Sequence, residues 1–237
     1  MTLNDPELVR AEYSNESRFT IRQSAWTRTT GPEVHDLVLE ALREISPVRV
    51  LEVGPGKGEL AERMVRELGA DVVAVDQSER MVELARTRGV NARLGDVQEL
   101  PFADESFDAC VAAWMLYHVP DLHRGLSELA RVLRPAGRLV AVTNSVWNLT
   151  ELWTLVGEPS RQSYPFSAEN AADILASHFG PVERRDARGT VTFSDAEAAR
   201  SYVAASVTRA HLAKRMPEFS GPLVASRSIA VFIATKL

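Results

Sequence analysis

Cysteine is nearly missing from this sequence, since Cys110 is the single thiol among 237 residues. One thiol cannot close a disulfide within the chain, which excludes a disulfide-stabilised scaffold and indicates a reducing, cytoplasmic location. Histidine is also scarce, with five residues. None has the spacing of a metal-ligand pair, because His118 and His123 lie five positions apart and off a shared helical face. We therefore expect no metal site.

Excess positive charge and long apolar runs are lacking as well. The chain has 27 basic and 32 acidic residues, a formal net charge of −5, with no basic stripe. Non-specific nucleic-acid binding needs clustered basic side chains, so no nucleic-acid partner is expected. The longest apolar stretch, residues 109–117, is far shorter than the roughly 20 residues that span a membrane. Asp5, Glu7 and Glu12 lie where an export signal would be basic and then apolar, so we expect neither a membrane partner nor export.

The central part of the chain alternates short β-rich runs with amphipathic helical patterns. Leu60, Met64 and Leu68, for example, recur at helical spacing before Gly69 ends the segment. Five strands are predicted, at residues 49–53, 71–76, 91–95, 107–114 and 138–143. This alternation predicts right-handed crossovers and a Rossmann-like α/β fold, a doubly wound and mostly parallel sheet with helices on both faces.

The flanking segments are less regular. Residues 1–46 are expected to be helical and to form a lid or cover. The later segments are predicted as a tryptophan-rich helical stretch after residue 143, a helix over 168–178, strands over 182–193 and 228–235, and helical residues 194–216. We expect an antiparallel strand near the C-terminus and further helical cover from the 144–220 region. Without a repeat or linker, the expectation is one domain over 1–237, divided into a cover (1–46), a core (48–143) and site-side elements with closing strands (144–237).

A glycine-rich loop, Glu52-Val53-Gly54-Pro55-Gly56-Lys57-Gly58, links the first predicted strand to the first helix. Glycines let the backbone approach a ligand closely, and a helix start presents free N–H groups. The loop also lies at the switch point of the sheet, where such folds bind nucleotides. A tight turn without a ligand is the alternative. Position 59 is Glu rather than the third glycine of a G-x-G-x-x-G fingerprint, which disfavours a nicotinamide dinucleotide.

An acidic side chain ends the second predicted strand. Asp76 follows Gly54 by 22 residues, the position from which a carboxylate can accept both hydroxyls of a ribose. The same charge repels a 2′-phosphate, which disfavours NADP. The alternative for Asp76 is a helix-capping or solvated residue at a strand end.

Four segments together resemble one family, the class I S-adenosylmethionine-dependent methyltransferases, in the small-molecule branch of the ubiquinone/menaquinone-type (methyltransferase type 11) enzymes. The segments, in order, are Val50 to Gly58, Val75 to Ser78 with Met81, Gly95 to Asp108 (GDVQELPFADESFD) and Arg131 to Leu139 (RVLRPAGRL). All four lie within residues 48–143, and the flanks match only loosely.

The resemblance implies a cofactor site. Gly54, Pro55 and Gly56 would lie against the methionine part of S-adenosylmethionine, with Glu52 near its ammonium group. The implied cofactor contacts are Glu52, Gly54, Pro55, Gly56, Gly58, Asp76, Gln77, Met81, Asp96, Val97, Ala113 and Trp114. Within this set, Asp76 would hold the ribose, and Asp96 with the Val97 N–H would recognise the adenine. Lys57 departs from the pattern of the branch, which more often has a small hydroxyl residue at this position. Its ammonium group could point either to solvent or to the cofactor carboxylate.

Methyl transfer mainly requires that the acceptor is held in line with a methyl group that is already activated. Oxygen or amine acceptors can also need a base. His118 and Tyr117 follow the fourth strand near the expected methyl position and are the catalytic candidates. A histidine that only packs or hydrogen-bonds locally is the alternative.

Further candidates lie in the flanks. Tyr13, Arg22 and Trp26 would cover the cofactor or acceptor from an N-terminal lid, and Asn144 and Trp147 would shape the acceptor pocket. Packing of these aromatic residues against the sheet or in the core is the alternative.

The sequence thus predicts a cytoplasmic enzyme that transfers a methyl group from S-adenosylmethionine to a small-molecule acceptor, a metabolite or natural product, and releases S-adenosylhomocysteine. A non-catalytic S-adenosylmethionine-binding module and an NAD-dependent oxidoreductase are the alternatives. The acceptor atom, the oligomeric state and the pathway stay open.

Overall fold

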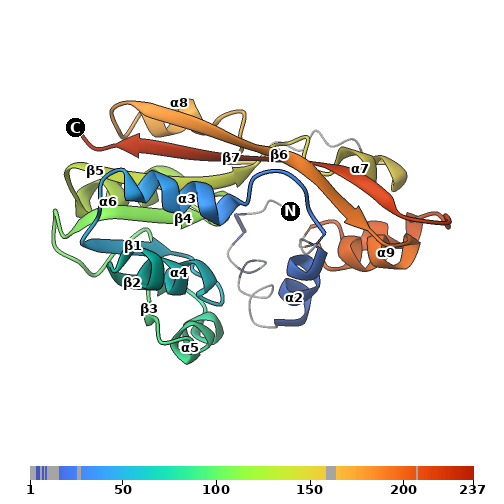
Figure 1. The fold of residues 1–237 in the computed structure, drawn as a ribbon, viewed down its shortest axis with the longest axis horizontal. Coiled ribbons are helices and arrows are strands. Elements are labelled where there is room, and N and C mark those ends of the chain that lie inside the picture. The colour runs from blue at the N-terminus through green and yellow to red at the C-terminus, as the bar shows by residue number, and fades with distance from the viewer. Residues whose placement is uncertain are drawn as a thin grey trace.

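The strands form one mixed sheet whose order places the glycine-rich loop at its middle. A computed structural model describes residues 4, 5, 7, 9, 16–25, 28–158, 164–206 and 208–237. The strands are β1 (Arg49–Val53), β2 (Asp71–Asp76), β3 (Asn91–Leu94), β4 (Phe107–Ala113), β5 (Leu133–Asn144), β6 (Val182–Phe193) and β7 (Leu223–Thr235). Their order is β3-β2-β1-β4-β5-β7-β6, with β7 antiparallel to both of its neighbours and the other pairs parallel (Figure 1). The order reverses beside β1, which makes the carboxyl end of β1 the switch point.

Helices cover both faces of this sheet. The helical elements are α2 (Glu16–Ala25), α3 (Val34–Arg43), α4 (Glu59–Leu68), α5 (Glu79–Thr87), η1 (Leu116–His118), α6 (Leu122–Val132), α7 (Thr150–Leu155), α8 (Ala171–Ala176), α9 (Ala196–Ala204) and η2 (Ala210–Arg215). On one face, Leu39 of α3 and Met64 of α4 pack with the strands in one apolar cluster. On the other, Leu126 of α6 and Leu175 of α8 do the same. The result is the doubly wound, three-layer arrangement that the alternating pattern predicts.

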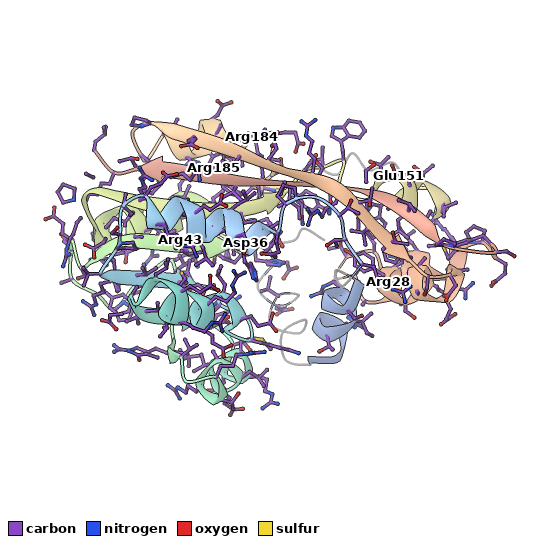
Figure 2. All side chains as sticks on the ribbon, in the orientation of Figure 1. Arg28, Asp36, Arg43, Glu151, Arg184 and Arg185 are labelled. Atoms are coloured by element: carbon purple, nitrogen blue, oxygen red, sulfur yellow. The ribbon has the colours of Figure 1, made fainter. Side chains whose placement is uncertain are left out.

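Ion pairs hold α3 in place at its exposed side. Asp36 of α3 accepts from the Arg63 guanidinium of α4 at 2.6 Å. Arg185 of β6 reaches Glu44, just after α3, at 2.5 Å. Figure 2 labels Asp36 on α3 and Arg185 on β6, the long edge strand. Exposed pairs of this kind contribute little individually, so the apolar face of α3 dominates its attachment.

A third apolar cluster lies beyond the parallel part of the sheet. There β6 and β7 continue as a long ribbon toward α7 and α9 (Figure 1). Leu152 of α7, Val203 of α9 and Leu212 of η2 pack together with Val191 and Ala225 of the ribbon. This cluster forms one wall of the space above the carboxyl ends of β1, β2 and β4.

Several predicted boundaries differ from the structure. The fifth strand begins at residue 133 rather than 138, because the chain leaves α6 directly into the sheet and crosses an irregularity opposite 107–109. The helix predicted over 168–178 is shorter, at 171–176, and β7 starts at residue 223 because it pairs along the full length of β6.

The N-terminal flank is not helical throughout. Thr29 forms an isolated bridge with Val191, and the Thr30 N–H donates to the Thr190 carbonyl at 3.0 Å. Gly31 and Pro32 break the helical pattern there, since proline lacks an N–H and glycine adopts a positive φ. Within the described ranges, every helix is too short or too polar to span a bilayer.

Candidate functional site

The glycine-rich loop turns sharply away from β1 and is tied to β2. Gly54 has a φ of +65°, and its N–H donates to the Val75 carbonyl at 2.8 Å. A Cβ at Gly54 would lie 2.8 Å from the Met115 Cβ, closer than side chains can pack. The loop therefore requires glycine at this position for two reasons, the backbone conformation and the approach of the chain after β4.

A cavity of about 880 Å³ opens above this loop. Its lower wall is formed by the carboxyl ends of β1, β2 and β4, and its other walls by residues of α2, α7, α9 and the segments around 164 and 209. The volume lies at the upper end of the roughly 300–1,000 Å³ of small-molecule sites. The cavity therefore has room for a nucleotide-sized ligand together with a second small molecule.

Glu52 brings a buried carboxylate to this cavity. The residue is 2% exposed, and its Oε2 atom has no hydrogen-bond partner among the described residues. Burial, and then the nearby charge of Asp76, raise the pKa of Glu52 to about 8, although the Ala61 N–H stabilises its ionised form. A buried acceptor without a partner is costly, so the geometry favours a ligand that supplies a donor or a positive charge here.

Asp76 lies at the end of the neighbouring strand and is also buried. Its Oδ1 atom accepts the Ser78 N–H at 2.9 Å. Burial raises the pKa of Asp76 to about 6, and the N–H groups of Ser78, Gly56 and Gln77 oppose that rise. The carboxylate is thus held against the glycine-rich loop, with lone pairs left to accept hydrogen bonds from a ligand.

Comparison with known proteins identifies this region. The family model described as a methyltransferase domain matches residues 51–141, the segment that contains the glycine-rich loop and both acids. Residues 51–141 of this chain are therefore similar to a methyltransferase domain.

Individual relatives agree with this assignment. An uncharacterized methyltransferase of Mycobacterium tuberculosis is 42% identical over 116 residues, which are 48% of this chain and 45% of that protein. A demethylmenaquinone methyltransferase of Thermotoga maritima is 36% identical over 106 residues, 44% of this chain and 46% of that protein. The chain thus spans about half the length of the curated relatives it matches.

A solved structure shows the same fold over more of the chain. A Thermotoga maritima protein, described as an S-adenosylmethionine-dependent methyltransferase and possible histamine N-methyltransferase, has a TM-score of 0.56 at 23% identity. The match covers 86% of this chain and 89% of that chain, so the likeness extends beyond the methyltransferase domain into both flanks.

The residues of the matched segment fit S-adenosylmethionine, the methyl donor of the family that the sequence resembles. The cofactor carries an ammonium group and two ribose hydroxyls, and the cavity presents the unpartnered Oε2 of Glu52 and the strand-end carboxylate of Asp76. An ammonium beside Glu52 would satisfy the orphaned oxygen and lower the pKa of that carboxyl.

Most residues predicted for the site line this one cavity. They are Arg22, Glu52, Gly54, Pro55, Gly56, Asp76, Gln77, Asp96, Val97, Ala113, Trp114, Tyr117, His118 and Asn144. Asp96 is exposed there, and its carboxylate accepts the Gln98 N–H at 2.8 Å. Tyr13 and Trp26 lie outside the described residues.

Three predicted residues lie away from the cavity wall. Gly58 begins α4, where a Cβ would meet Ala85 of α5 at 2.9 Å, so this glycine serves helix packing. Met81, on the buried face of α5, is fully buried, and Trp147 is 46% exposed at the surface. Sequence spacing places a residue on an element, but the rotation of that element decides which way its side chain points.

The candidates after β4 form a polar and aromatic wall. Trp114, at a φ of +55°, donates from Nε1 to the Asn144 Oδ1 atom at 3.2 Å, which joins the ends of β4 and β5. The rings of Tyr117 and His118 are 4.5 Å apart, and His118 is buried at 8% exposure. Both side chains are thus in contact with the space where an acceptor would bind.

Helix α2 lies close to the glycine-rich loop, as expected of a cover. Lys57 Nζ donates to Thr20 Oγ1 at 2.8 Å, and Arg22 donates to the Ala205 carbonyl at 2.6 Å. Lys57 therefore points to α2, which answers the question that its unusual residue type raised. The two contacts connect α2 to the loop on one side and to the end of α9 on the other.

Sequence reasoning missed several further residues that line the cavity. They are His35, Trp153, Tyr164, Tyr202, Arg209 and Arg227. Burial lowers the pKa of His35, whose ring centroid is 6.0 Å from that of Trp114. No local motif marks these positions, because they come from six separate segments that only the tertiary fold brings together.

The histidines also include a pair that spacing did not suggest. His123 Nδ1 and His178 Nε2 are 2.9 Å apart, although 55 residues separate them in the chain. Within the described part of the chain, no third metal-ligating side chain completes this pair.

Proposed function

We propose that this chain transfers a methyl group from S-adenosylmethionine to a small-molecule acceptor. The observation that supports this most is the buried, unpartnered Oε2 of Glu52, which lies beside Asp76 in the cavity above the glycine-rich loop. When bound, S-adenosylmethionine supplies a methyl group that is already activated on a sulfonium centre.

The residues of the chain would bind and orient the two reactants. Glu52 would accept from the ammonium group, Asp76 from the ribose hydroxyls, and Asp96 with the Val97 N–H would contact the adenine. Gly54 and Gly56 would allow the backbone to approach the methionine part. Positioning of this kind can supply much of the rate enhancement, because it converts a bimolecular step into an effectively unimolecular one.

A small acceptor is favoured by the enclosure of the cavity. Helix α2 and the segments around residues 164 and 209 contribute to its walls, opposite the carboxyl ends of the strands. A protein or nucleic-acid acceptor would need an open surface beside the methyl position. His118 and Tyr117 would take or relay the proton that an oxygen or nitrogen acceptor loses. We propose the cytoplasm as the location, on the strength of the lone buried Cys110.

The test begins with the cofactor. Purified protein is checked by mass spectrometry for bound ligand and then titrated calorimetrically with S-adenosylmethionine, S-adenosylhomocysteine and NAD. The proposal expects micromolar or tighter binding of the two sulfur nucleotides and none of NAD. Formation of S-adenosylhomocysteine in the presence of pooled small metabolites then distinguishes an enzyme from a binding module. Binding of NAD alone would overturn the proposal.

A further inference from the structure

Arg209 carries a buried charge that no described residue of the protein neutralises. The residue is 4% exposed and lines the cavity at the start of η2. Its Nη2 atom donates to the Tyr164 hydroxyl at 3.2 Å, and its Cζ lies 4.1 Å from the centroid of the Trp153 ring. The Nη1 atom has no hydrogen-bond partner among the described residues. A guanidinium stays protonated at any relevant pH, so this is a permanent positive charge with a free donor.

Several other arginines of the chain pair with carboxylates. Arg63 pairs with Asp36 at 2.6 Å, and Arg131 pairs with Glu128 at 2.7 Å. Arg227, also buried, donates from Nη2 to the Pro32 carbonyl at 2.6 Å, while its Nε atom has no hydrogen-bond partner among the described residues. Its role is thus at least partly to secure the turn before α3. For Arg209 no carboxylate of the described residues lies within 4.0 Å. A buried charge without a counter-charge is unfavourable, and an aromatic face compensates only part of the loss.

The position of Arg209 is on the aromatic side of the cavity. Tyr164, whose hydroxyl accepts that hydrogen bond, has its ring centroid 6.1 Å from that of Tyr117, which follows β4. Tyr202 also lines the cavity, and its pKa is raised to about 12 by burial in spite of the charges of Arg22 and Arg209. Tyr202 is therefore a neutral phenol at physiological pH and cannot serve as the missing counter-charge.

We propose that Arg209 binds an oxyanion, a carboxylate or a phosphate ester, on a planar acceptor that lies against the rings of Tyr117 and Tyr164. This rests on the proposed function, because it names the class of acceptor for that same cavity. The Nη1 atom donates a charge-assisted hydrogen bond to the anion, and the rings contact the planar part of the molecule. Arg209 would therefore hold the anionic end of the acceptor, and the rest of the molecule would extend toward the glycine-rich loop.

The experiment compares three probes that share one ring. Phenylacetate, phenyl phosphate and the uncharged phenylacetamide are titrated into the full chain loaded with S-adenosylhomocysteine, with ligand-observed NMR as the readout. We expect at least one of the two anions to bind ten times or more tightly than the amide. The two anionic arms show which oxyanion the site takes. Equal binding of all three probes would overturn the proposal.

Substitutions of Arg209 test whether the preference for anions depends on this residue. Arg209→Met should abolish the anion preference while the affinity for S-adenosylhomocysteine stays within twofold. Arg188→Met is the matched control, because that arginine is on β6 with a side chain 76% exposed, and it should keep the preference. Arg209→Gln, which retains polarity, provides a second variant if the methionine variant fails to fold. A tenfold loss of S-adenosylhomocysteine binding in either Arg209 variant would instead assign Arg209 to the cofactor carboxylate and overturn the inference.

Failure of the proposed function is separable from failure of this inference. If S-adenosylhomocysteine does not bind the wild-type chain, the same three probes are titrated into the ligand-free protein. An anion preference that depends on Arg209 would then support the oxyanion site without a methyl-transfer role. If the ligand-free protein shows no such preference, both the oxyanion site and the methyl-transfer function would be rejected.

Discussion

Glu52 and Asp76 end neighbouring parallel strands and line the same cavity, and the charge of Asp76 helps to raise the pKa of Glu52 to about 8. Two buried carboxylates this close repel each other, so the ligand-free site holds fewer negative charges at neutral pH than its residue types suggest. A ligand with a positive charge relieves that repulsion. The pair therefore links cofactor binding to protonation.

Cofactor binding should release a proton near pH 7. Glu52 is mostly protonated there in the ligand-free protein, because its pKa is about 8, whereas pairing with an ammonium group requires the ionised form. Calorimetric titration with S-adenosylhomocysteine in phosphate and in Tris should give different apparent enthalpies, since the two buffers take up protons with different heats. Equal enthalpies in both buffers would remove Glu52 from the role of ammonium acceptor.

Replacing Glu52 should stabilise the ligand-free protein at alkaline pH and weaken binding. The folded-state pKa is raised from 4.5 to about 8, so the unfolded chain releases this proton first and the free energy of unfolding falls as pH rises through that interval. Glu52→Gln removes this loss of stability, because glutamine does not ionise. At pH 8.5 the variant should be more stable than wild type by about 2–4 kcal/mol, on a scale of roughly 1.4 kcal/mol per pKa unit.

The control for this prediction is the same comparison at pH 5. The folded forms of both proteins are uncharged at position 52 there, and the unfolded wild-type chain is close to its own pKa of 4.5. Urea unfolding should therefore give free energies within about 1 kcal/mol of each other. A stability gain of the same size at both pH values would point to packing rather than to the charge of Glu52.

Asp76→Ala should weaken S-adenosylhomocysteine binding by about 2–3 kcal/mol, the scale of hydrogen bonds to a charged group. Asp71→Ala is the matched control, because Asp71 begins the same strand with a side chain 61% exposed, at the end away from the cavity. Calorimetry on the two variants decides the assignment. Unchanged affinity in the Asp76 variant would contradict a role in holding the ribose.

Gly54→Ala should destabilise the protein more than Gly69→Ala does. The two glycines have φ values of +65° and +66°, so the backbone strain of alanine is similar at both. They differ in surroundings, because a Cβ at Gly54 meets Met115 at 2.8 Å and one at Gly69 meets nothing within 4 Å. We expect about 1 kcal/mol for Gly69, and a further 1–3 kcal/mol for the crowding at Gly54, by thermal unfolding. Equal losses would mean that the loop can move away from Met115.

His118→Ala should leave the affinity for S-adenosylhomocysteine within about twofold. As a general base for an identified acceptor, His118 would contribute about 10²–10⁴-fold to turnover. His35→Ala is the comparison, because His35 lines the same cavity from α3. A large loss of turnover only in the His118 variant assigns the base. Turnover that survives in it makes His118 a packing residue, and a loss only in the His35 variant moves the role to α3.

The core of the fold was readable from the sequence because its signals are local. Residues 71–76 form a strand with the predicted boundaries, and the glycine-rich loop follows 49–53 as expected. Periodicity, capping residues and glycine positions depend only on residues a few positions apart. The structure therefore forms these elements where the sequence predicts them. The fifth strand was less well placed, since residues 133–137 join the sheet through an irregular pairing with β4 that no local pattern marks.

The same distinction between local signals and tertiary packing applies to the side chains of the site. Glu52 and Asp76 were predictable, because a strand end in a parallel sheet fixes where its side chain lies. Met81 and Trp147 were not, since the rotation of α5 and the packing beside α7 decide that one is buried and the other exposed.

By itself, the sequence determined the alternating α/β core and the edge of the sheet where the residues of the proposed cofactor site gather. Only the tertiary structure decided the wall of the cavity that we propose for the acceptor. Trp153, Tyr164 and Arg209 belong to segments that share no motif, and they meet because β6 and β7 extend past the sheet and carry α7 and α9 over the cavity. Contacts between distant segments depend on how whole elements pack, and a single sequence does not encode that packing in any local pattern.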